Sequence, residues 1–330
     1  MVKINAFGGI KMKILAFSAN LDGFEKEIER FSGIADVDFV ISDAVEESEV
    51  VAAARDADII LFASTKLNRA VISKLEKCKL IVRYGIGYDT VDTTAAREKG
   101  IFVCNSPNYG IIDVAEHAIS LLLSAAKRLT YLNARVNVGE WALSDEIGPA
   151  TRLAGKTVGF VGFGNIGKAV CRRTNAFDMK PIVYDPFVSD EALREYGAER
   201  KELEELLAES DFVSLHLPLN EKTRGSIGAR ELSKMKKTAV LINTSRGVII
   251  NEKELAEALE SGTIAAVGLD VFENESGKLD GRLLNSKRSV FTPHVAWNTD
   301  RAMPSLHAEV IENVLRFLKG ERPNNVVNGL

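Results

Sequence analysis

The chain has 330 residues, of which 46% are hydrophobic and 27% are charged, and its formal net charge at pH 7 is −4. This composition is typical of a globular protein with two domains of ordinary size, and the mixed charges give no basic face for nucleic acid. No apolar run approaches the roughly 20 residues that a membrane span needs, so we expect no membrane partner.

The N-terminus, the cysteines and the histidines carry little signal for targeting or metal binding. Residues 1–10 lack the apolar core of a secretory signal and are soon followed by Lys11 and Lys13. The three cysteines are widely scattered, and the four histidines show no metal-ligand spacing. We therefore expect a cytoplasmic protein with reduced cysteines and no metal. Met12 could be the structural start, with residues 1–11 as an extension.

Apolar strand-like runs alternate with helical patterns in the first hundred residues. We predict strands over 13–17, 38–41, 59–63, 80–84 and 102–104, and helices over 25–31, 46–55 and 68–77. Such alternation is typical of a parallel sheet flanked by helices, so these residues are expected to form a small doubly wound α/β domain.

Two further segments, a loop and a long helix, are informative in this part of the chain. Arg83–Asp89 comes after a predicted strand and contains two nearby glycines, whose backbone N–H groups can face a bound anion. The alternative is a plain strand-to-helix turn. Val114–Leu129, rich in alanine and leucine, is predicted to be a helix. His117 on this helix is either a packing residue or a chemical one, and we favour packing.

The segment Thr157–Gly167 gives the strongest signal. Val158–Val161 is a predicted buried strand, and three glycines then follow with the spacing G-x-G-x-x-G before a helix: Gly162, Gly164 and Gly167. The first permits a tight turn, the second lets the backbone approach a pyrophosphate, and the third lets helix and strand pack closely. The phosphates would bind free N–H groups at the helix N-terminus. We favour dinucleotide binding over a glycine turn without a ligand.

Asp185 ends the next predicted strand, 181–184. Its carboxylate can accept hydrogen bonds from the adenosine ribose hydroxyls and would repel a 2′-phosphate, which favours NAD over NADP. More strands are predicted over 212–217, 239–243, 266–269 and 290–292. A helix between them has a predicted capping box at Asn251–Glu254 and a stop at Gly262.

The last predicted helix, Leu306–Leu318, carries apolar residues at helical spacing. If it packs on the first domain, the nucleotide domain is an insertion in the chain. We therefore expect a substrate domain made of residues 1–109 and 299–330 and an NAD-binding domain made of residues 110–298. The cleft between the two would hold the substrate. His307 on this helix is predicted to lie at the surface.

Two residues at predicted strand ends are candidates for catalysis. Arg246 follows a strand, and its guanidinium can grip a carboxylate and polarise a neighbouring carbonyl; the alternative is a solvated turn arginine. His294 also follows a strand and can act as a general acid and base, unless it is a buried histidine with one hydrogen bond. Glu275 could orient His294, and Glu273 competes for that role.

Taken together and in order, these segments resemble the D-isomer-specific 2-hydroxyacid dehydrogenase family over almost the whole chain. The segments that carry the resemblance are Arg83–Asp89, Val114–His117, Gly162–Gly167, His216–Pro218, Asn243–Gly247, Gly268–Phe272 and Thr292–His294. Within the family, Arg83–Asp89, Val103–Pro107 and His294–Trp297 are similar to phosphoglycerate-dehydrogenase-like members and to the C-terminal-binding-protein branch.

The resemblance implies two doubly wound parallel-sheet domains, with a Rossmann NAD-binding domain inserted into a flavodoxin-like substrate domain. It also implies a homodimer and a catalytic set of Arg246, Glu275 and His294. The family usually has Glu-Pro where this chain has Glu275 followed by serine, which makes that assignment the weakest of the three. The chain ends soon after its last helix, so we expect it to lack the regulatory extension of many phosphoglycerate dehydrogenases.

The motifs and the resemblance together predict the contact residues. Predicted cofactor contacts are Ile86, Gly162, Gly164, Asn165, Ile166, Gly167, Asp185, His216, Leu217, Pro218, Thr223, Thr244, Ser245, Arg246, Asp270, His294 and Trp297. Predicted substrate contacts are Tyr84, Gly85, Ile86, Gly87, Arg246 and His294. Selectivity for the substrate side chain is expected from Tyr84, Ile86, Tyr109 and Trp297.

The expected function is hydride transfer between NAD(H) and a small D-2-hydroxy acid and 2-oxo acid pair. The substrate would be of the hydroxypyruvate or glyoxylate type or of the 3-phosphoglycerate type. The alternative is an NAD(H)-responsive binding protein that resembles the corepressor branch and has weak or no dehydrogenase activity. The catalytic set alone does not separate the two, because those binding proteins retain it.

Overall fold

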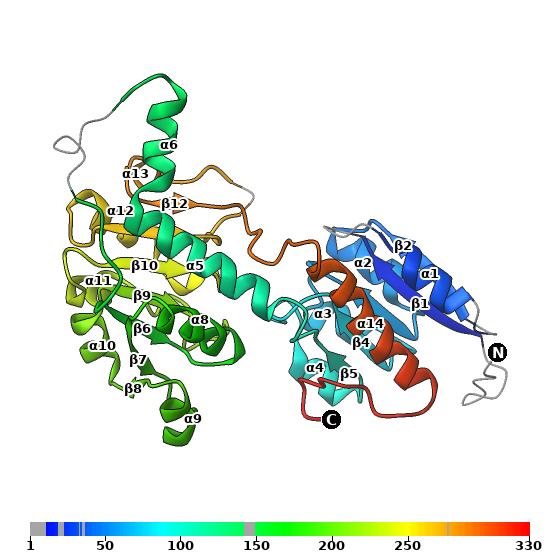
Figure 1. Ribbon diagram of the computed structural model, residues 1–330. Helices are drawn as coiled ribbons and strands as arrows, with labels where there is room; N and C mark the ends of the chain where they lie inside the picture. Colours follow the sequence, from blue (N-terminus) through cyan, green and yellow to red (C-terminus); the bar gives the residue numbers. More distant parts are fainter. Residues whose placement is uncertain (1–10, 19–22, 33, 35–36, 142–148, 276) are drawn as a thin grey trace. The chain divides into compact units, whose positions relative to one another are not determined.

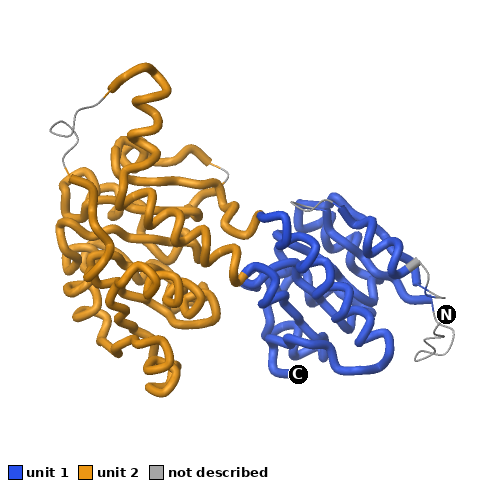
Figure 2. The backbone as a smooth tube through the Cα atoms, viewed as in Figure 1, with its two compact units in different colours: residues 1–110, 299–330 blue, residues 111–298 orange. Residues whose placement is uncertain are grey.

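The computed structural model describes residues 11–18, 23–32, 34, 37–141, 149–275 and 277–330. The chain forms two compact units, Met1–Gly110 with Thr299–Leu330, and Ile111–Asn298 (Figure 2). The second unit is therefore inserted into the first along the chain. The predicted extension, residues 1–11, lies outside the described residues except for Lys11, and the first strand begins at Met12.

The first unit contains a five-stranded parallel sheet with the order β2-β1-β3-β4-β5. The strands are β1 (Met12–Phe17), β2 (Val37–Ser42), β3 (Ile59–Phe62), β4 (Leu80–Arg83) and β5 (Phe102–Cys104). Helices α1 (Glu25–Ser32), α2 (Glu47–Ala54), α3 (Arg69–Lys74) and α4 (Thr93–Glu98) connect them. This is the flavodoxin-like strand order that was predicted for the outer domain.

Helix α14 (Ala302–Leu318) brings the end of the chain back to the first unit (Figure 1). Its residues Leu306, Val310 and Val314 recur at helical spacing and are buried in the same cluster as Leu80 and Val82 of β4. The tail that follows α14 adds hydrogen bonds to the β5 edge of the sheet.

The second unit contains a seven-stranded parallel sheet with the order β12-β11-β10-β9-β6-β7-β8. The strands are β6 (Thr157–Val161), β7 (Lys180–Tyr184), β8 (Glu199–Arg200), β9 (Phe212–Leu215), β10 (Val240–Asn243), β11 (Ala266–Leu269) and β12 (Val290–Phe291). Counted from β6, this is the dinucleotide-binding order 3-2-1-4-5-6 with one further strand. The order reverses at β6, where such sheets bind their ligand.

Helices cover both faces of this sheet. The helices of the second unit are α5 (Ile111–Lys127), α6 (Leu129–Asn137), α8 (Asn165–Asn175), α9 (Asp190–Glu195), α10 (Leu203–Glu209), α11 (Ala229–Lys234), α12 (Glu252–Glu260) and α13 (Gly281–Leu284), with a 3₁₀ turn at Gly247–Ile249. Successive strand residues point to opposite faces, so Phe160 packs with α5 and α8 whereas Val161 packs with α10 and α11.

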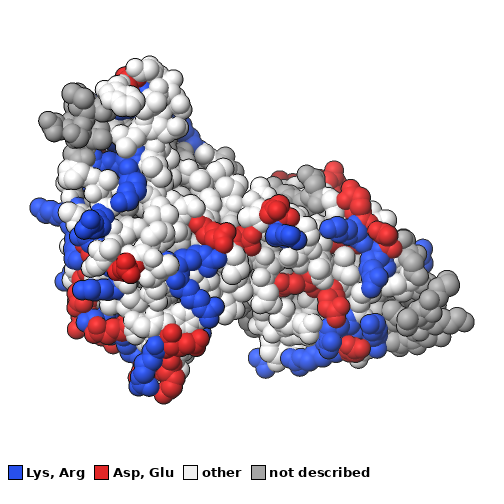
Figure 3. Space-filling view, viewed as in Figure 1, with Lys and Arg blue, Asp and Glu red and all other residues white. Residues whose placement is uncertain are grey.

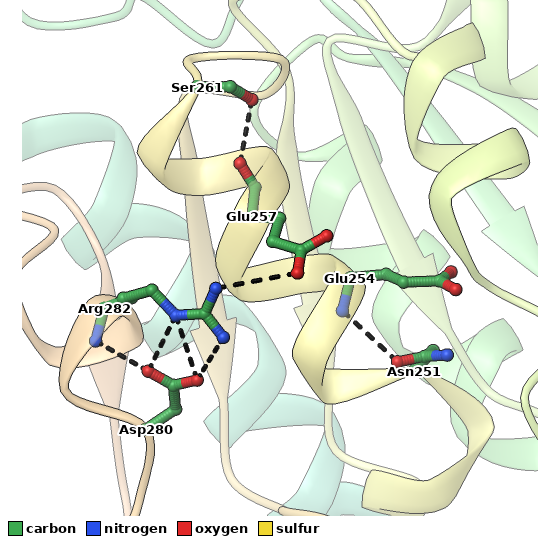
Figure 4. A network of polar contacts seen from close by, with 6 residues as sticks. All are labelled: Asn251, Glu254, Glu257, Ser261, Asp280 and Arg282. Atoms are coloured by element: carbon green, nitrogen blue, oxygen red, sulfur yellow. Dashed lines mark hydrogen bonds and ion pairs between the residues drawn. The ribbon is translucent and has the colours of Figure 1, made fainter.

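Three local predictions need correction or detail. The predicted helix over 114–129 is two helices, because Arg128 adopts a left-handed φ of 56° between α5 and α6. Strand β8 was not predicted. The capping box of α12 forms only in part: Asn251 accepts the Glu254 N–H (Figure 4), but the Glu254 carboxylate accepts the Ala229 N–H of α11.

The other end of α12 follows the prediction, since Gly262 has a φ of +69° directly after it. Beside α12, the carboxylate of Asp280 accepts hydrogen bonds from Arg282, whose guanidinium also lies 3.7 Å from Glu257 (Figure 4). These contacts tie α12 to α13 at the surface of the unit.

Charges of both signs are interspersed on the face of each unit that Figure 3 shows. Within the described ranges, no helix is long and apolar enough to cross a membrane. Nor do the described residues include a group of three or more His, Cys, Asp or Glu side chains that could hold a metal ion.

Candidate active site

The glycine turn between β6 and α8 has the geometry of a phosphate cradle. Gly162 has a φ of +90°, and a Cβ there would lie 2.6 Å from the carbonyl oxygen of His216. A Cβ on Gly167 would lie 2.9 Å from the Gly162 carbonyl oxygen, so helix and turn pack as predicted. A Cβ on Gly164, by contrast, would meet no atom within 4 Å. Protein packing therefore does not require glycine at position 164, whereas close approach of a ligand would.

The surroundings of this turn fit a bound dinucleotide. Helix α8 begins with glycine at its N-cap, so no capping side chain occupies the N–H groups of Asn165, Ile166 and Gly167. The hydroxyl of Thr244, which follows β10 in the same sheet, is buried without a hydrogen-bond partner. Buried hydroxyls rarely lack a partner, and a ligand would supply one. Both features suit the pyrophosphate cofactor that the motif predicts.

Asp185 follows β7 and is held by two backbone N–H groups. Its Oδ2 accepts the N–H of Phe163 at 2.7 Å, and its Oδ1 accepts the N–H of Phe187 at 2.8 Å. The first bond joins the carboxylate directly to the glycine turn. Each oxygen keeps a second acceptor position, which is what hydrogen bonding to ribose hydroxyls requires.

His216 and the loop that contains Leu217 follow strand β9. Burial lowers the pKa of His216 to about 4, and its Nε2 lies 2.9 Å from the hydroxyl of Ser214. The ring is therefore neutral near pH 7. The hydroxyl of Thr223 donates to the Pro218 carbonyl at 2.7 Å, which closes the loop containing Leu217.

The loop after β10 presents Arg246. Asn243, which is fully buried at the end of the strand, accepts the N–H of Ser245 at 2.9 Å and donates to the carbonyl of Arg246 at 3.0 Å. The hydroxyl of Ser245 donates to the carbonyl of Leu215 at 2.6 Å. Ser245 thus ties the loop to the neighbouring strand. Sequence reasoning did not single out Asn243, although it lies within the Asn243–Gly247 segment.

Glu275 and His294 form a hydrogen-bonded pair. The Nδ1 of His294 lies 2.7 Å from Oε2 of Glu275, with the two side chains 40% and 42% exposed. Burial raises the pKa of Glu275, but the hydrogen bond and charge of His294, a backbone hydrogen bond from Phe272 and the charge of Arg246 outweigh it, so the pKa is lowered. The competing residue, Glu273, has an exposed side chain, and its N–H donates to Glu252.

Asp270 organises the loop that carries His294. It is fully buried, and its carboxylate accepts the backbone N–H groups of Val295 at 2.9 Å and Ala296 at 2.8 Å. The Asp270 carbonyl accepts the N–H of His294 at 2.7 Å. The Nε1 of Trp297 donates to the carbonyl of His294 at 3.0 Å, which closes the turn on its other side.

In the first unit, two residues that follow strand β5 hold the loop after β4. Asn105 donates from its side chain to the Ile86 carbonyl at 2.7 Å, and the N–H of Ser106 donates to the carbonyl of Gly85 at 3.0 Å. Gly85 has a φ of +137° and is buried, whereas Ile86 and Gly87 are half-buried. Sequence reasoning named Asn105 and Ser106 only as part of a family segment, and their role in holding this loop was not predicted.

Two expectations for the first unit differ from the structure. His307 is buried rather than on the surface: its Nδ1 lies 2.5 Å from Oε1 of Glu27, which is fully buried in α1. The hydroxyl of Tyr84 donates to the same Glu27 oxygen at 3.0 Å. The Tyr84 side chain is therefore part of the core, so of this residue only the backbone is left for the predicted substrate contact.

Comparison with known proteins decides the family. The sequence model of the D-isomer-specific 2-hydroxyacid dehydrogenase NAD-binding domain matches residues 119–296. The chain belongs to this family. Its second unit is the NAD-binding domain, and the family places the chain among NAD-dependent dehydrogenases that act on the CH–OH group of D-2-hydroxy acids.

Relatives of this dehydrogenase have several substrates. It is 40% identical over 281 residues to a glyoxylate reductase of Thermococcus litoralis, which is 83% of this chain and 84% of that protein. It is 40% identical over 290 residues to a D-3-phosphoglycerate dehydrogenase of Methanocaldococcus jannaschii, which is 87% of this chain but 55% of that protein. The chain thus spans about half the length of that phosphoglycerate dehydrogenase.

Solved structures extend the likeness to almost the whole fold. A glyoxylate reductase from Paecilomyes thermophila matches with a TM-score of 0.88 and 31% identity, over 96% of this chain and 99% of that one. A D-lactate dehydrogenase from Aquifex aeolicus, solved with NAD and lactic acid, matches with a TM-score of 0.84 and 31% identity, over 93% of this chain and 96% of that one. The predicted family, fold class and cofactor are confirmed.

Proposed function

We propose that this dehydrogenase interconverts a small 2-oxo acid and its D-2-hydroxy acid with NAD(H). The proposal rests on the hydrogen bond between His294 and Glu275. The charge of Arg246 also acts on the Glu275 carboxylate and lowers its pKa. The residues 162–167 and Asp185 hold the dinucleotide. When bound, NADH supplies the hydride that reduces the carbonyl carbon.

Arg246 binds the substrate carboxylate through paired N–H donors and polarises the adjacent carbonyl as negative charge develops on its oxygen. His294 completes the reaction with a proton. Because Nδ1 is engaged by Glu275, Nε2 is the atom that donates a proton to the carbonyl oxygen in reduction and takes it back in oxidation. Glu275 holds the ring in place and balances the positive charge of the imidazolium.

The substrate is a small 2-oxo acid such as glyoxylate, hydroxypyruvate or phosphohydroxypyruvate. Relatives that carry the names glyoxylate reductase, hydroxypyruvate reductase and D-3-phosphoglycerate dehydrogenase support this range. In the first unit, Asn105 and Ser106 keep the loop of Gly85–Gly87 in shape. The N–H group of Gly85 donates to the Arg83 carbonyl, so the N–H groups of Ile86 and Gly87 are the ones in this loop that can bind an anion.

The protein is a cytoplasmic homodimer that associates through α6 and residues 138–141. Four large apolar side chains there are strongly exposed: Leu129 (54%), Val136 (57%), Val138 (73%) and Trp141 (84%). Helix α6 buries none of its own residues. Exposed apolar side chains grouped in this way are typical of an interface. Light scattering of wild type and of Trp141→Glu measures whether the substitution lowers the mass from that of two chains to that of one.

The test of the activity is a panel of 2-oxo acids with NADH. Wild type is expected to oxidise NADH with at least one of glyoxylate, pyruvate, hydroxypyruvate and phosphohydroxypyruvate, and His294→Gln is expected to lose about a hundredfold or more in kcat. If His294→Gln stays within a few-fold of wild type, His294 is not the acid and base. If no 2-oxo acid is reduced while NADH still binds, the protein is a binding protein.

A further inference from the structure

His294 has an unusual backbone conformation. Its φ is +54°, in the left-handed region that non-glycine residues seldom adopt. Such a residue keeps this conformation only where the surrounding structure enforces it. The enforcing contacts come from Asp270, whose backbone accepts the N–H of His294 and whose carboxylate accepts the next two N–H groups, those of Val295 and Ala296.

The buried Asp270 carboxylate has one further partner, the side chain of Thr292. The Thr292 hydroxyl oxygen lies 2.6 Å from Oδ1 of Asp270. A carboxylate can only accept, so the single hydroxyl proton of Thr292 is used in this bond. The hydroxyl of Thr292 can still accept a hydrogen bond through its lone pairs.

The donor to Thr292 is His117 of α5. The Nε2 of His117 lies 2.8 Å from the Thr292 hydroxyl oxygen and 3.5 Å from Oδ1 of Asp270. Because the hydroxyl proton of Thr292 already belongs to the bond with Asp270, His117 must carry a proton on Nε2 and donate it. The hydrogen bonds therefore run in one direction, from His117 to Thr292 to Asp270, and the Asp270 carboxylate is fully buried.

We propose that His117 is a positioning residue for catalysis, acting on the backbone of His294 through Thr292 and Asp270. The inference rests on the proposed function, in which His294 is the acid and base. Without the hydrogen bond from His117, the Thr292 hydroxyl can rotate. Rotation breaks its hydrogen bond to Asp270. The buried carboxylate then loses one of its partners, and the His294 turn loses its rigid support.

The experiment compares two His117 variants with a neighbour on the same helix. His117→Leu removes the donor, whereas His117→Gln keeps an N–H near the position of Nε2. Glu116→Gln is the matched control, because Glu116 is exposed on α5 and pairs only with Arg173 in the contacts of the described residues. For each variant, kcat, KM for the 2-oxo acid and hydrogen exchange at the amides of Val295 and Ala296 are measured.

His117→Leu is expected to lower kcat by about tenfold to a hundredfold, as a small misplacement of a catalytic group does, with KM changed less than kcat. Exchange at Val295 and Ala296 should become faster. His117→Gln should recover most of both properties, and Glu116→Gln should match wild type. The proposal is overturned if His117→Leu keeps kcat within twofold, or if the two amides stay as protected as in wild type.

Thr292→Val gives a second route should His117→Leu fold poorly, because it removes the hydroxyl and nearly keeps the shape. Thr292→Val should lower kcat by about tenfold or more and speed exchange at Val295 and Ala296, because it breaks the same chain of hydrogen bonds without changing His117. A Thr292→Val variant with the kcat and the exchange of wild type would overturn the proposal. If wild type reduces no 2-oxo acid, the proposed function fails, and the exchange data alone still decide whether His117 supports this turn.

Discussion

The Nδ1 atom of His294 lies 2.7 Å from Oε2 of Glu275, although 19 residues separate them along the chain. This contact sets the orientation of the ring, and in the proposed function it leaves Nε2 of the imidazole for the substrate. Glu275 keeps this position even though the residue after it departs from the Glu-Pro pattern of the family.

Glu275→Gln keeps the size of the side chain but removes the charge that balances the imidazolium. We expect kcat to fall at least about tenfold while KM for NADH changes little, since the group acts on the proton donor and not on the dinucleotide. Steady-state kinetics measure both. Glu273→Gln, only two positions away and exposed, is the matched control and should stay within twofold. Equal losses in the two variants would mean that Glu275 has no special role.

We propose that Asp185 sets the choice between the two dinucleotides. Replacing it in Asp185→Ser removes the charge that repels a 2′-phosphate, so the ratio of kcat/KM for NADH to that for NADPH should fall by about tenfold or more. Asp190→Ser, which changes an exposed carboxylate paired with Arg200, should leave the ratio unchanged. An unchanged ratio in Asp185→Ser would move the discrimination to another residue.

The sequence was sufficient for the elements whose pattern is local. The strands β1, β3 to β7 and β9 to β12 contain buried apolar residues, and the glycine turn follows one of them; β2 has no buried residue, but its apolar residues also gave a strand pattern. Strand β8 was not predicted because Glu199–Arg200 are two exposed, charged residues without any periodic pattern. The break at Arg128 was not predicted either, because neither glycine nor proline marks it.

The environment of His216 makes stability depend on pH. Its pKa in the folded protein, about 4, is below the ordinary 6.5, so the unfolded chain takes up a proton first as the pH falls. Stability is therefore lost between about pH 6.5 and pH 4. From pH 7.5 to 5.0 the loss is at most about 2 kcal/mol, since the ring keeps some exposure to water.

Urea unfolding of wild type and His216→Gln at these two pH values isolates this effect from that of the carboxylates. Wild type should lose more stability than the variant between pH 7.5 and pH 5.0. The same loss in both proteins would show that His216 is not neutral at pH 5.0 in the folded state.

The buried pair of Glu27 and His307 should be important for the first unit. Removing one partner leaves the other without its counterpart in the core, so His307→Ala is expected to cost about 3 kcal/mol or more. The double variant Glu27→Leu/His307→Leu should be more stable than the single one, because the buried carboxylate is gone and only the hydroxyl of Tyr84, which donates to Glu27, loses its partner. Native-state hydrogen exchange of α1 and α14 measures the stability of this unit directly. A cost below about 1 kcal/mol would contradict this reading.

The sequence around His307 indicates that its side chain is buried, although we predicted it at the surface. Positions 307, 310 and 314 share one side of the helix, and Val310 and Val314 are both buried there. No local pattern indicates the partner of His307, because Glu27 is 280 residues away in the sequence. The same holds for the candidate site: Arg246 and His294 were predicted from their places after strands, whereas the support of His294 by Thr292 depends on contacts across the sheet.

We propose that the protein uses NADH to reduce a 2-oxo acid to the D-hydroxy acid. The most direct measurement incubates wild type with NADH and either pyruvate or hydroxypyruvate and resolves the product by chiral chromatography, next to NADH consumption. We expect at least one substrate to be consumed with one equivalent of NADH and to give only the D-enantiomer. An L product, or no consumption of NADH with any 2-oxo acid, would contradict it.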